Sequence, residues 1–232
     1  MTPRKKTKDG NAEGLTIFTV GHSTRPIEEF LALLAAHGIE RLVDVRSIPK
    51  SRRVPQFNSD ALATSLGKKG IEYVHLKSLG GLRHAKKDSV NLGWRNASFR
   101  GYADYMATEE FRAGIAGLLE LARRKSTAIM CAEAVPWRCH RSLIGDALLV
   151  RGVAVKDIMS SSSVRPHEMT SFAKTDGLEI SYPAEPDQGT RLQRSGTPPL
   201  RDCRGSVSLY HSLGFANMKR GAGPARPSFK ES

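Results

Sequence analysis

The amino-acid sequence predicts a single three-layer α/β domain, with a mainly parallel sheet of about five strands and helices on both faces. Two observations predict this fold class. Short apolar runs alternate along the chain with longer segments that carry apolar residues at helical spacing. Several of the short runs are apolar throughout, which is typical of parallel strands that helices cover on both faces. We expect the domain over residues 15–182.

The first β-α-β unit is the clearest part of this pattern. Residues 15–20 form an apolar run, residues 27–38 place apolar side chains at helical spacing, and residues 41–45 form a second run. A connection of this kind makes the two strands parallel with a right-handed crossover. The later elements are expected to be a short helix over 59–66, a strand over 71–76, a loop-rich stretch over 77–100, a long helix from Thr108, a strand over 126–130, a helix over 142–150 and a strand over 153–159.

Length and composition limit the kind of protein that this chain forms. With 232 residues and 39% hydrophobic side chains, it is long enough for one full core. No apolar run reaches the roughly 18 residues of a membrane-spanning helix. The basic leader, residues 1–14, lacks the apolar stretch of a secretory signal. We therefore expect a cytoplasmic protein without membrane contact. Residues 183–232 are rich in Pro, Gly, Ser and Arg, and both ends of the chain are expected to be disordered.

The charge and the cysteines point to a basic protein with reduced thiols. The formal net charge is +13, which favours an anionic partner such as a nucleotide, a phosphorylated metabolite or nucleic acid. A basic surface without a specific partner accounts for the same charge, so charge alone does not decide. Three cysteines, an odd number, do not form a disulfide framework.

One polar segment, Cys131–Arg141, stands between a predicted strand and a predicted helix, where parallel α/β folds open onto their ligand-binding crevice. The unpaired N–H groups at the start of a helix favour anions and lower the pKa of a thiol. A thiolate there is a nucleophile, and a carboxylate or an imidazole carries the proton. The candidate catalytic residues are Cys131, Glu133, Cys139, His140 and His22.

The carboxyl ends of parallel strands lie at one edge of a sheet, so further polar residues after other strands are expected to converge on this segment. Asp44 and Arg46 follow the second strand; the pair fits a structural salt bridge and a ligand contact equally well. A long loop after the third strand mixes basic and aromatic residues, as stacking platforms for nucleobases do. The candidate substrate- or anion-binding residues are Ser23, Asp44, Arg46, Arg52, Arg83, Trp94, Arg95, Arg138 and Arg141.

Five motifs in this order resemble the domain of unknown function 488 family. They are Val20-Gly-His-Ser23, Val43-Asp-Val-Arg-Ser-Ile-Pro-Lys-Ser-Arg52, Leu79-Gly-Gly-Leu-Arg83, Gly101-Tyr-Ala-Asp-Tyr-Met106 and the segment Cys131–Arg141. The resemblance covers residues 15–182. It implies a compact α/β domain whose signatures are the cysteine segment and the aspartate-arginine segment. It implies no reaction, because the family is named for lacking an assigned function.

The first hypothesis is an enzyme that acts on a nucleotide, a nucleic-acid component or another phosphorylated substrate through the segment Cys131–Arg141. The chain is alternatively a non-catalytic module that binds nucleotide or nucleic acid, with structural or redox-responsive thiols. A cysteine-phosphatase loop requires five residues between cysteine and arginine, whereas Arg138 lies one position too far from Cys131. No cofactor is clearly indicated. Zinc is a minor alternative, with Cys131, Cys139, His140 and His22 as ligands.

Overall fold

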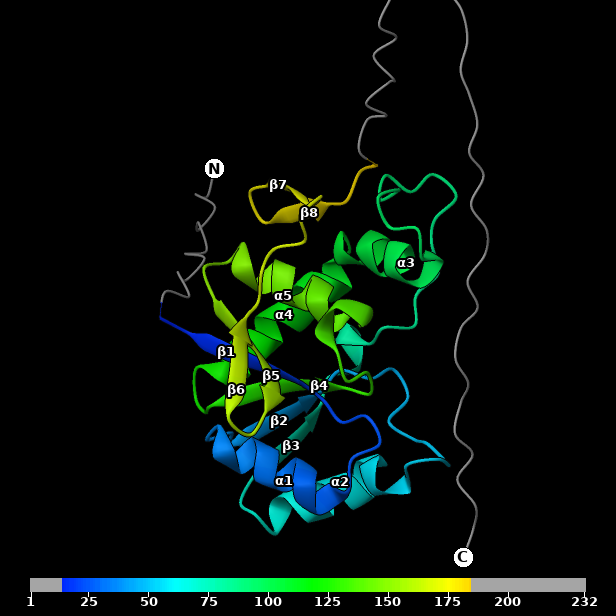
Figure 1. Ribbon diagram of the computed structural model, residues 1–232. Helices are drawn as coiled ribbons and strands as arrows, with labels where there is room; N and C mark the ends of the chain where they lie inside the picture. The colour runs from blue at the N-terminus through cyan, green and yellow to red at the C-terminus, as the bar shows by residue number, and fades with distance from the viewer. Residues whose placement is uncertain (1–13, 185–232) are drawn as a thin grey trace, which may run out of the picture. The chain divides into compact units, whose positions relative to one another are not determined.

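The computed structural model describes residues 14–184, which fold around one six-stranded sheet (Figure 1). The strands are, from one edge to the other, β3 (Glu72–His75), β2 (Arg41–Asp44), β4 (Thr127–Cys131), β1 (Thr16–Gly21), β5 (Ala154–Ser160) and β6 (Ser163–Pro166). The first five are parallel, and β6 pairs antiparallel with β5. The predicted mainly parallel sheet is confirmed, and β6 extends it at one edge.

Helices cover both faces of the sheet, as Figure 1 shows. One face carries α1 (Ile27–Ala36) and α2 (Ser59–Gly67); the other carries α3 (Ala97–Met106), α4 (Glu109–Ala122) and α5 (Arg141–Leu149). The remaining elements are the 3₁₀ turns η1 (Pro55–Phe57), η2 (Lys77–Leu79) and η3 (Pro136–Arg138) and the hairpin strands β7 (Lys174–Asp176) and β8 (Glu179–Ser181). None of the helices within residues 14–184 combines the length and the apolar character that a membrane crossing requires.

Local sequence explains where the central elements form. All residues of β2 and β4 are buried, because both strands lie inside the sheet with helices on each side. The helix α4 begins after Thr108, whose hydroxyl oxygen accepts a hydrogen bond from the backbone N–H of Phe111 at 3.3 Å. Glu109 and Glu110 lie in its first turn, where the helix dipole favours negative charge. The sequence thus explains why β2 and β4 lie inside the sheet and why α4 begins at Glu109.

The structure differs from the sequence-based expectation in two places. The stretch over 77–100, expected as loop, contains η2 and leads into α3, which was not predicted. The strands β6, β7 and β8 follow the last predicted strand and were also missed. They are short, and all of their residues except Ile180 and Ser181 are exposed, so they carry no apolar pattern. The predicted disorder of the leader and of the C-terminal extension concerns residues almost entirely outside the described part of the chain.

A buried polar network joins α5 to the strands β1 and β5. His167, in the turn after β6, lies between two carboxylates: Nε2 is 3.1 Å from Asp146 and Nδ1 is 3.2 Å from Asp157. The hydroxyl of Tyr182 donates to Asp146 at 2.8 Å, and the hydroxyl of Thr19 donates to Asp157 at 2.5 Å. The imidazolium therefore compensates two carboxylates that are buried inside the domain.

Replacing His167 by Gln is expected to lower the free energy of unfolding by about 3 kcal/mol below neutral pH, because it leaves two buried carboxylates without their cation. Burial lowers the pKa of His167, but the hydrogen bonds to Asp146 and Asp157 outweigh burial and raise the pKa to about 9. The unfolded value is 6.5. The stabilisation by the protonated ring is therefore complete below pH 6.5 and is lost as the pH rises through about 9.

Urea unfolding of the wild type and His167→Gln across this pH range measures the difference. The difference in unfolding free energy should be largest below pH 6.5, narrow as the pH rises from 6.5 to about 9, and be small above that. His84→Gln is the matched control, because His84 is exposed, and its effect should be small at every pH. A difference that stays constant with pH would mean that the ring contributes by packing and not by charge.

Candidate functional site

The turns that follow β1, β2 and β4 lie at one edge of the sheet, where backbone hydrogen bonds join two of them. The N–H of His22 donates to the carbonyl of Cys131 at 3.0 Å, and the N–H of Ser23 donates to the carbonyl of Ala132 at 2.8 Å. Gly21 makes this approach possible, since a Cβ atom there would lie 1.8 Å from the carbonyl oxygen of Glu133. The pairing of β1 with β4 thus continues into the turns and brings the predicted histidine turn against the cysteine turn.

The centre of the site is a thiol–imidazole cluster formed by Cys131, Cys139 and His140. Nδ1 of His140 lies 3.8 Å from Sγ of Cys131 and 3.6 Å from Sγ of Cys139. Nε2 of His140 lies 3.0 Å from the carbonyl oxygen of Val45, at the end of β2. Because a carbonyl only accepts hydrogen bonds, Nε2 carries a hydrogen, and Nδ1 faces both sulfur atoms. Gly81 packs directly against this imidazole.

The cluster divides the two thiols into a stronger and a weaker acid. The interaction with the Cys131 thiol lowers the pKa of Cys139, and His140 and Arg141 lower it further, against the effect of burial. The interaction with Cys139 and burial both raise the pKa of Cys131. One thiolate is therefore favoured at Cys139, with the neutral thiol of Cys131 as its donor. Cys139 lies just before α5, as the sequence predicted for this segment.

Asp44 and Arg46, at the end of β2, form a buried ion pair. Nη2 of Arg46 lies 2.6 Å from Oδ2 of Asp44 and also donates to the carbonyl of Phe57 at 2.7 Å. The hydroxyl of Tyr73 donates to the same carboxylate oxygen at 2.9 Å. The guanidinium of Arg46 thus has protein partners on several sides. Of the two roles expected for this pair, the structure shows the salt bridge that fixes the turn.

His22 connects this ion pair to the turn after β1. Burial lowers its pKa to about 4, so the ring is neutral at physiological pH. Nδ1–H donates to the carbonyl of Ser23 at 2.7 Å, and Nε2 accepts from Nη1 of Arg46 at 3.2 Å. The ring stacks on Phe57 with centroids 4.2 Å apart. Both ring nitrogens therefore have protein partners.

Arg141 holds the cysteine turn from within the core. Its side chain is 1% exposed. Nη2 donates to the carbonyl of Glu133 at 2.7 Å, and Nη1 donates to the hydroxyl of Thr19 at 3.0 Å. Thr19 in turn donates to Asp157, so the guanidinium is linked to the buried network around His167. Arg141, expected to contact an anion directly, instead contributes its charge from beneath the turn.

The remaining predicted residues are distributed more widely. Glu133 and Arg138 are exposed on the cysteine turn, and Arg52 is exposed in the turn after β2. Arg83 stacks its guanidinium on Tyr105, 3.5 Å from the ring centroid. Arg95 is exposed just before α3. The indole of Trp94 packs into an aromatic group made of Phe99, Phe172 and Tyr182. The structure brings Arg83, Trp94 and Arg95 into no contact with the thiols.

Within the described residues, the one group of side chains that could hold a metal ion is the thiol–imidazole cluster. The ligand atoms of Cys131, Cys139 and His140 lie within 4.8 Å of one another. His22, the fourth ligand considered from the sequence, directs both nitrogens elsewhere. Within residues 14–184 the group therefore offers three of the four donors that a structural zinc site has, so a closed structural zinc site is not formed.

Four polar residues of the site's surroundings were not singled out from the sequence: Thr19, Tyr73, Asp157 and His167. Thr19 and Asp157 lie in the strands β1 and β5, among buried apolar neighbours. A polar side chain that is buried beside apolar residues of a strand requires a partner. That requirement is the signal which identifies Thr19 and Asp157 in the sequence, although it does not name the partners.

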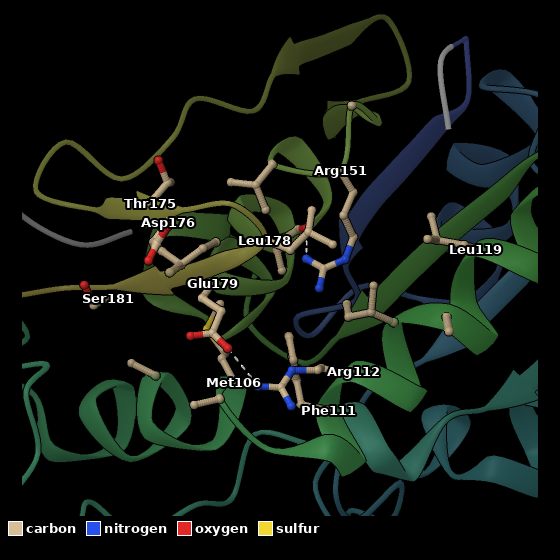
Figure 2. Close-up of a pocket in the computed structure, with 18 of the residues that line it drawn as sticks. Met106, Phe111, Arg112, Leu119, Arg151, Thr175, Asp176, Leu178, Glu179 and Ser181 are labelled. Carbon is tan, nitrogen blue, oxygen red and sulfur yellow. Dashed lines mark hydrogen bonds and ion pairs between the residues drawn. The ribbon is translucent and has the colours of Figure 1, made fainter. Parts of the chain in front are cut away.

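A wide groove lies apart from this site. It has a volume of about 1170 Å³ and is bounded by α4, the end of α5 and the hairpin of β7 and β8 (Figure 2). The ion pair between Arg112 and Glu179, at 3.0 Å, joins α4 to the hairpin there. None of the predicted site residues within the described chain lines it. The groove is therefore no part of the candidate site.

A comparison with protein families confirms the resemblance given by the motifs. The model of the family described as domain of unknown function DUF488 matches residues 26–148, which is more than half of the chain. The matched span contains the turns after β2 and β4 and the thiol–imidazole cluster, whereas His22 precedes it. Neither the comparison with curated proteins nor the comparison with solved structures gave a match.

Replacing Gly81 by Ala is expected to displace the imidazole of His140, because the added Cβ would lie 2.4 Å from Nδ1. The thiolate of Cys139 would then lose a stabilising neighbour, and the midpoint pH of its alkylation should rise. Iodoacetamide alkylation followed by site-resolved mass spectrometry measures this midpoint. Gly117→Ala in α4 is the control, since a Cβ there meets no atom within 4 Å. An unchanged midpoint in Gly81→Ala would show that His140 does not control the thiol.

Proposed function

This chain belongs to the family described as domain of unknown function DUF488, and we propose that it is a thiol-dependent enzyme acting on a phosphorylated substrate, a nucleotide or a nucleic-acid component. The reaction takes place at the cysteine turn at the carboxyl edge of the sheet. The observation that carries this proposal is the position of His140. Its Nε2 is fixed by Val45, and its Nδ1 faces two thiols, one of which has a lowered pKa.

In this proposal Cys139 is the nucleophile and His140 is the proton carrier. The thiolate sulfur forms a bond to the electrophilic centre of the substrate while the bond to the leaving group breaks. The leaving group keeps the electron pair of that bond and takes the proton from the imidazolium of His140. Water then cleaves the bond between sulfur and substrate, and a proton of that water returns to the imidazole. Glu133, exposed on the same turn, is the second candidate for carrying this proton.

The positive potential at the turn favours an anionic substrate. Arg46 and Arg141 are buried below the turn, and both of their guanidiniums already have protein partners. They attract an anion through their charge without binding it directly. Arg138 and Arg52 are exposed at the same edge and are free to move toward a phosphate. In the first turn of α5, the N–H groups of Ser142 and Leu143 already donate to the carbonyls of Cys139 and His140, so the helix start contributes its dipole more than free donors.

One observation supports a second candidate function, a non-catalytic module that binds nucleotide or nucleic acid. Cys131 is 8% exposed and Cys139 is 3% exposed. Thiols at this depth also serve as packing groups, and two sulfur atoms within 4.8 Å of each other form a disulfide after modest movement. In that case the thiols are structural or respond to oxidants. The chemical reactivity of Cys139 in the folded protein separates the two functions.

Iodoacetamide is expected to alkylate Cys139 of the folded wild type at a rate that remains high below neutral pH, where an ordinary thiol with a pKa near 8.5 is protonated. Because the pKa of Cys139 is lowered, the rate should fall only at the acidic pH at which the thiolate becomes protonated. Inorganic phosphate at millimolar concentration should slow the reaction. Peptide-level mass spectrometry distinguishes Cys139 from Cys131 and from Cys203, which lies outside the described residues.

The variants Cys139→Ser, Cys131→Ser and His140→Asn assign the roles. Cys139→Ser should remove the fast alkylation, and His140→Asn should shift its midpoint to higher pH. Cys131→Ser keeps a hydroxyl donor next to the thiolate and should change the midpoint least. If Cys131 and Cys139 are modified only after unfolding in urea, the enzyme is excluded and the binding module with structural or redox-responsive thiols remains.

A further inference from the structure

A second hollow adjoins the cysteine turn on the side of β5 and β6. Its volume is about 610 Å³. It is bounded by η3, the first turn of α5, the strand ends around Met159 and Arg165, and the segment 166–171. We propose that this hollow binds the base of a nucleotide, so that the substrate class of the site is a nucleotide and not a simple sugar phosphate. This inference rests on the function proposed above.

Both tryptophans of the chain line this hollow. Trp137 lies in η3, between the two cysteines of the site, and is 57% exposed. Trp94 contributes to the wall from the loop before α3. A tryptophan exposed to this extent costs hydrophobic free energy unless a partner covers it. Every nucleobase has an aromatic face that stacks on indole, and such stacking is a sequence-tolerant source of affinity.

Trp94 also leaves a hydrogen-bond donor unused. Its Nε1–H is buried and has no partner among the residues of the described chain. A buried donor without an acceptor is costly, and the Nε atoms of Arg41 and Arg141 share this state, so the feature is not particular to the hollow. The ring itself is held by Phe99, Phe172 and Tyr182, with ring centroids 4.7, 5.0 and 5.5 Å away. Because Nε1 itself is buried, a base in the hollow meets the indole ring of Trp94 and not this donor.

The remaining lining suits a flat ring with an anionic substituent. Met159, Met169, Pro136 and Pro166 supply apolar surface, and methionine adapts to ligands of different outline. Arg165 lies on the exposed edge strand β6 and forms no ion pair within residues 14–184. The lining also contains the acidic residues Asp157 and Glu168. Asp157 is already paired with His167. Glu168 is exposed and is the one carboxylate of the lining that forms no ion pair within the described residues.

The hollow and the thiols share one structural element. Pro136 and Ser142, which both line the hollow, hold the backbone on either side of Cys139. The N–H of Cys139 donates to the carbonyl of Pro136 at 3.0 Å, and the hydroxyl of Ser142 donates to the carbonyl of Cys139 at 3.0 Å. A base bound in the hollow therefore lies next to Pro136 and Ser142, whose groups are hydrogen-bonded to the backbone of Cys139, although Cys139 itself does not line the hollow. Its sugar and phosphate extend toward the turn, where the anion is expected.

Binding of adenosine 5′-monophosphate, uridine 5′-monophosphate and ribose 5-phosphate to the full chain tests this inference. Calorimetry should show both nucleotides binding at least roughly tenfold more tightly than ribose 5-phosphate, because one stacked base contributes a factor of that size. Both tryptophans should report the nucleotides by saturable fluorescence quenching, corrected against free N-acetyltryptophanamide. Ribose 5-phosphate, which lacks the base, should give no saturable quenching.

Variants at Trp137 separate stacking from general effects. Trp137→Ala should reduce nucleotide affinity roughly tenfold and leave ribose 5-phosphate binding unchanged, whereas Trp137→Phe should retain most of the nucleotide affinity. Leu178→Ala is the matched control, since Leu178 is also an exposed large hydrophobic residue but lines the separate groove of Figure 2. Its nucleotide affinity should equal that of the wild type. Thermal unfolding of each variant checks that the fold is retained.

Two results would overturn the inference. Equal affinities for the nucleotides and ribose 5-phosphate, or no nucleotide binding at millimolar concentration, would show that the hollow does not take a base. Nucleotide affinity that is unchanged in Trp137→Ala would do the same. The proposed function is tested separately by the alkylation of Cys139. If ribose 5-phosphate protects Cys139 as well as the nucleotides do, the enzyme proposal stands without a base site. If Cys139 is inert while the nucleotides bind, only the enzyme proposal fails.

Discussion

The buried guanidinium of Arg141 is the constraint on which the arrangement of the site depends. A charged group that is 1% exposed must be compensated by hydrogen bonds, and Arg141 finds them in the turn after β4 and in the hydroxyl of Thr19. The carbonyl of Glu133 is thereby drawn inward over Gly21, the one residue type that leaves room for it. The shape of the cysteine turn therefore follows from an electrostatic requirement of the core, and the thiols are placed as a consequence.

The need to compensate buried charge also explains why Arg46 and Arg141 are paired with protein groups and are not available to bind a ligand. Arg46 is neutralised by Asp44, and the charge of Arg141 is linked through Thr19 to the carboxylate of Asp157. Of these two fixed charges, Arg141 lowers the pKa of Cys139. In the function proposed above, direct phosphate contacts are assigned to exposed arginines such as Arg138. Preorganised charge and adaptable binding groups are thus divided between buried and exposed positions.

Most of the fold was predictable, because its central strands are apolar runs, its helices carry apolar residues at helical spacing, and α4 begins at a recognisable cap, Thr108. The exception, α3, buries Asp104, which accepts hydrogen bonds from the side chains of Ser89 and Asn91. A helix whose buried face includes a carboxylate does not show the apolar period that identifies helices in a sequence. It also contains Gly101, which packs against the backbone of the preceding loop where a Cβ would not fit. Both features depend on tertiary contacts that a single sequence does not display.

The site was predictable to the extent that topology determines it. The rule that parallel strands end at one edge correctly placed the turns of His22, Asp44 and Cys131 together. The rule does not say which charged side chains point inward. Arg141 was expected to face a ligand because its position beside a thiol at a helix start is ambiguous. Its burial is decided by Thr19 and Asp157, on strands far away in the sequence.

The cysteine turn has two sides with different surroundings. On one side, His140 is held by the end of β2 and faces the sulfur atoms; on the other, η3 presents Trp137 to the hollow beside β5 and β6. The two sides meet at Cys139, whose backbone is hydrogen-bonded to Pro136 and Ser142. A ligand that presses on η3 therefore acts on the backbone that carries the thiolate. In the proposals made above, recognition and chemistry are coupled through the hydrogen bonds that join Pro136, Cys139 and Ser142.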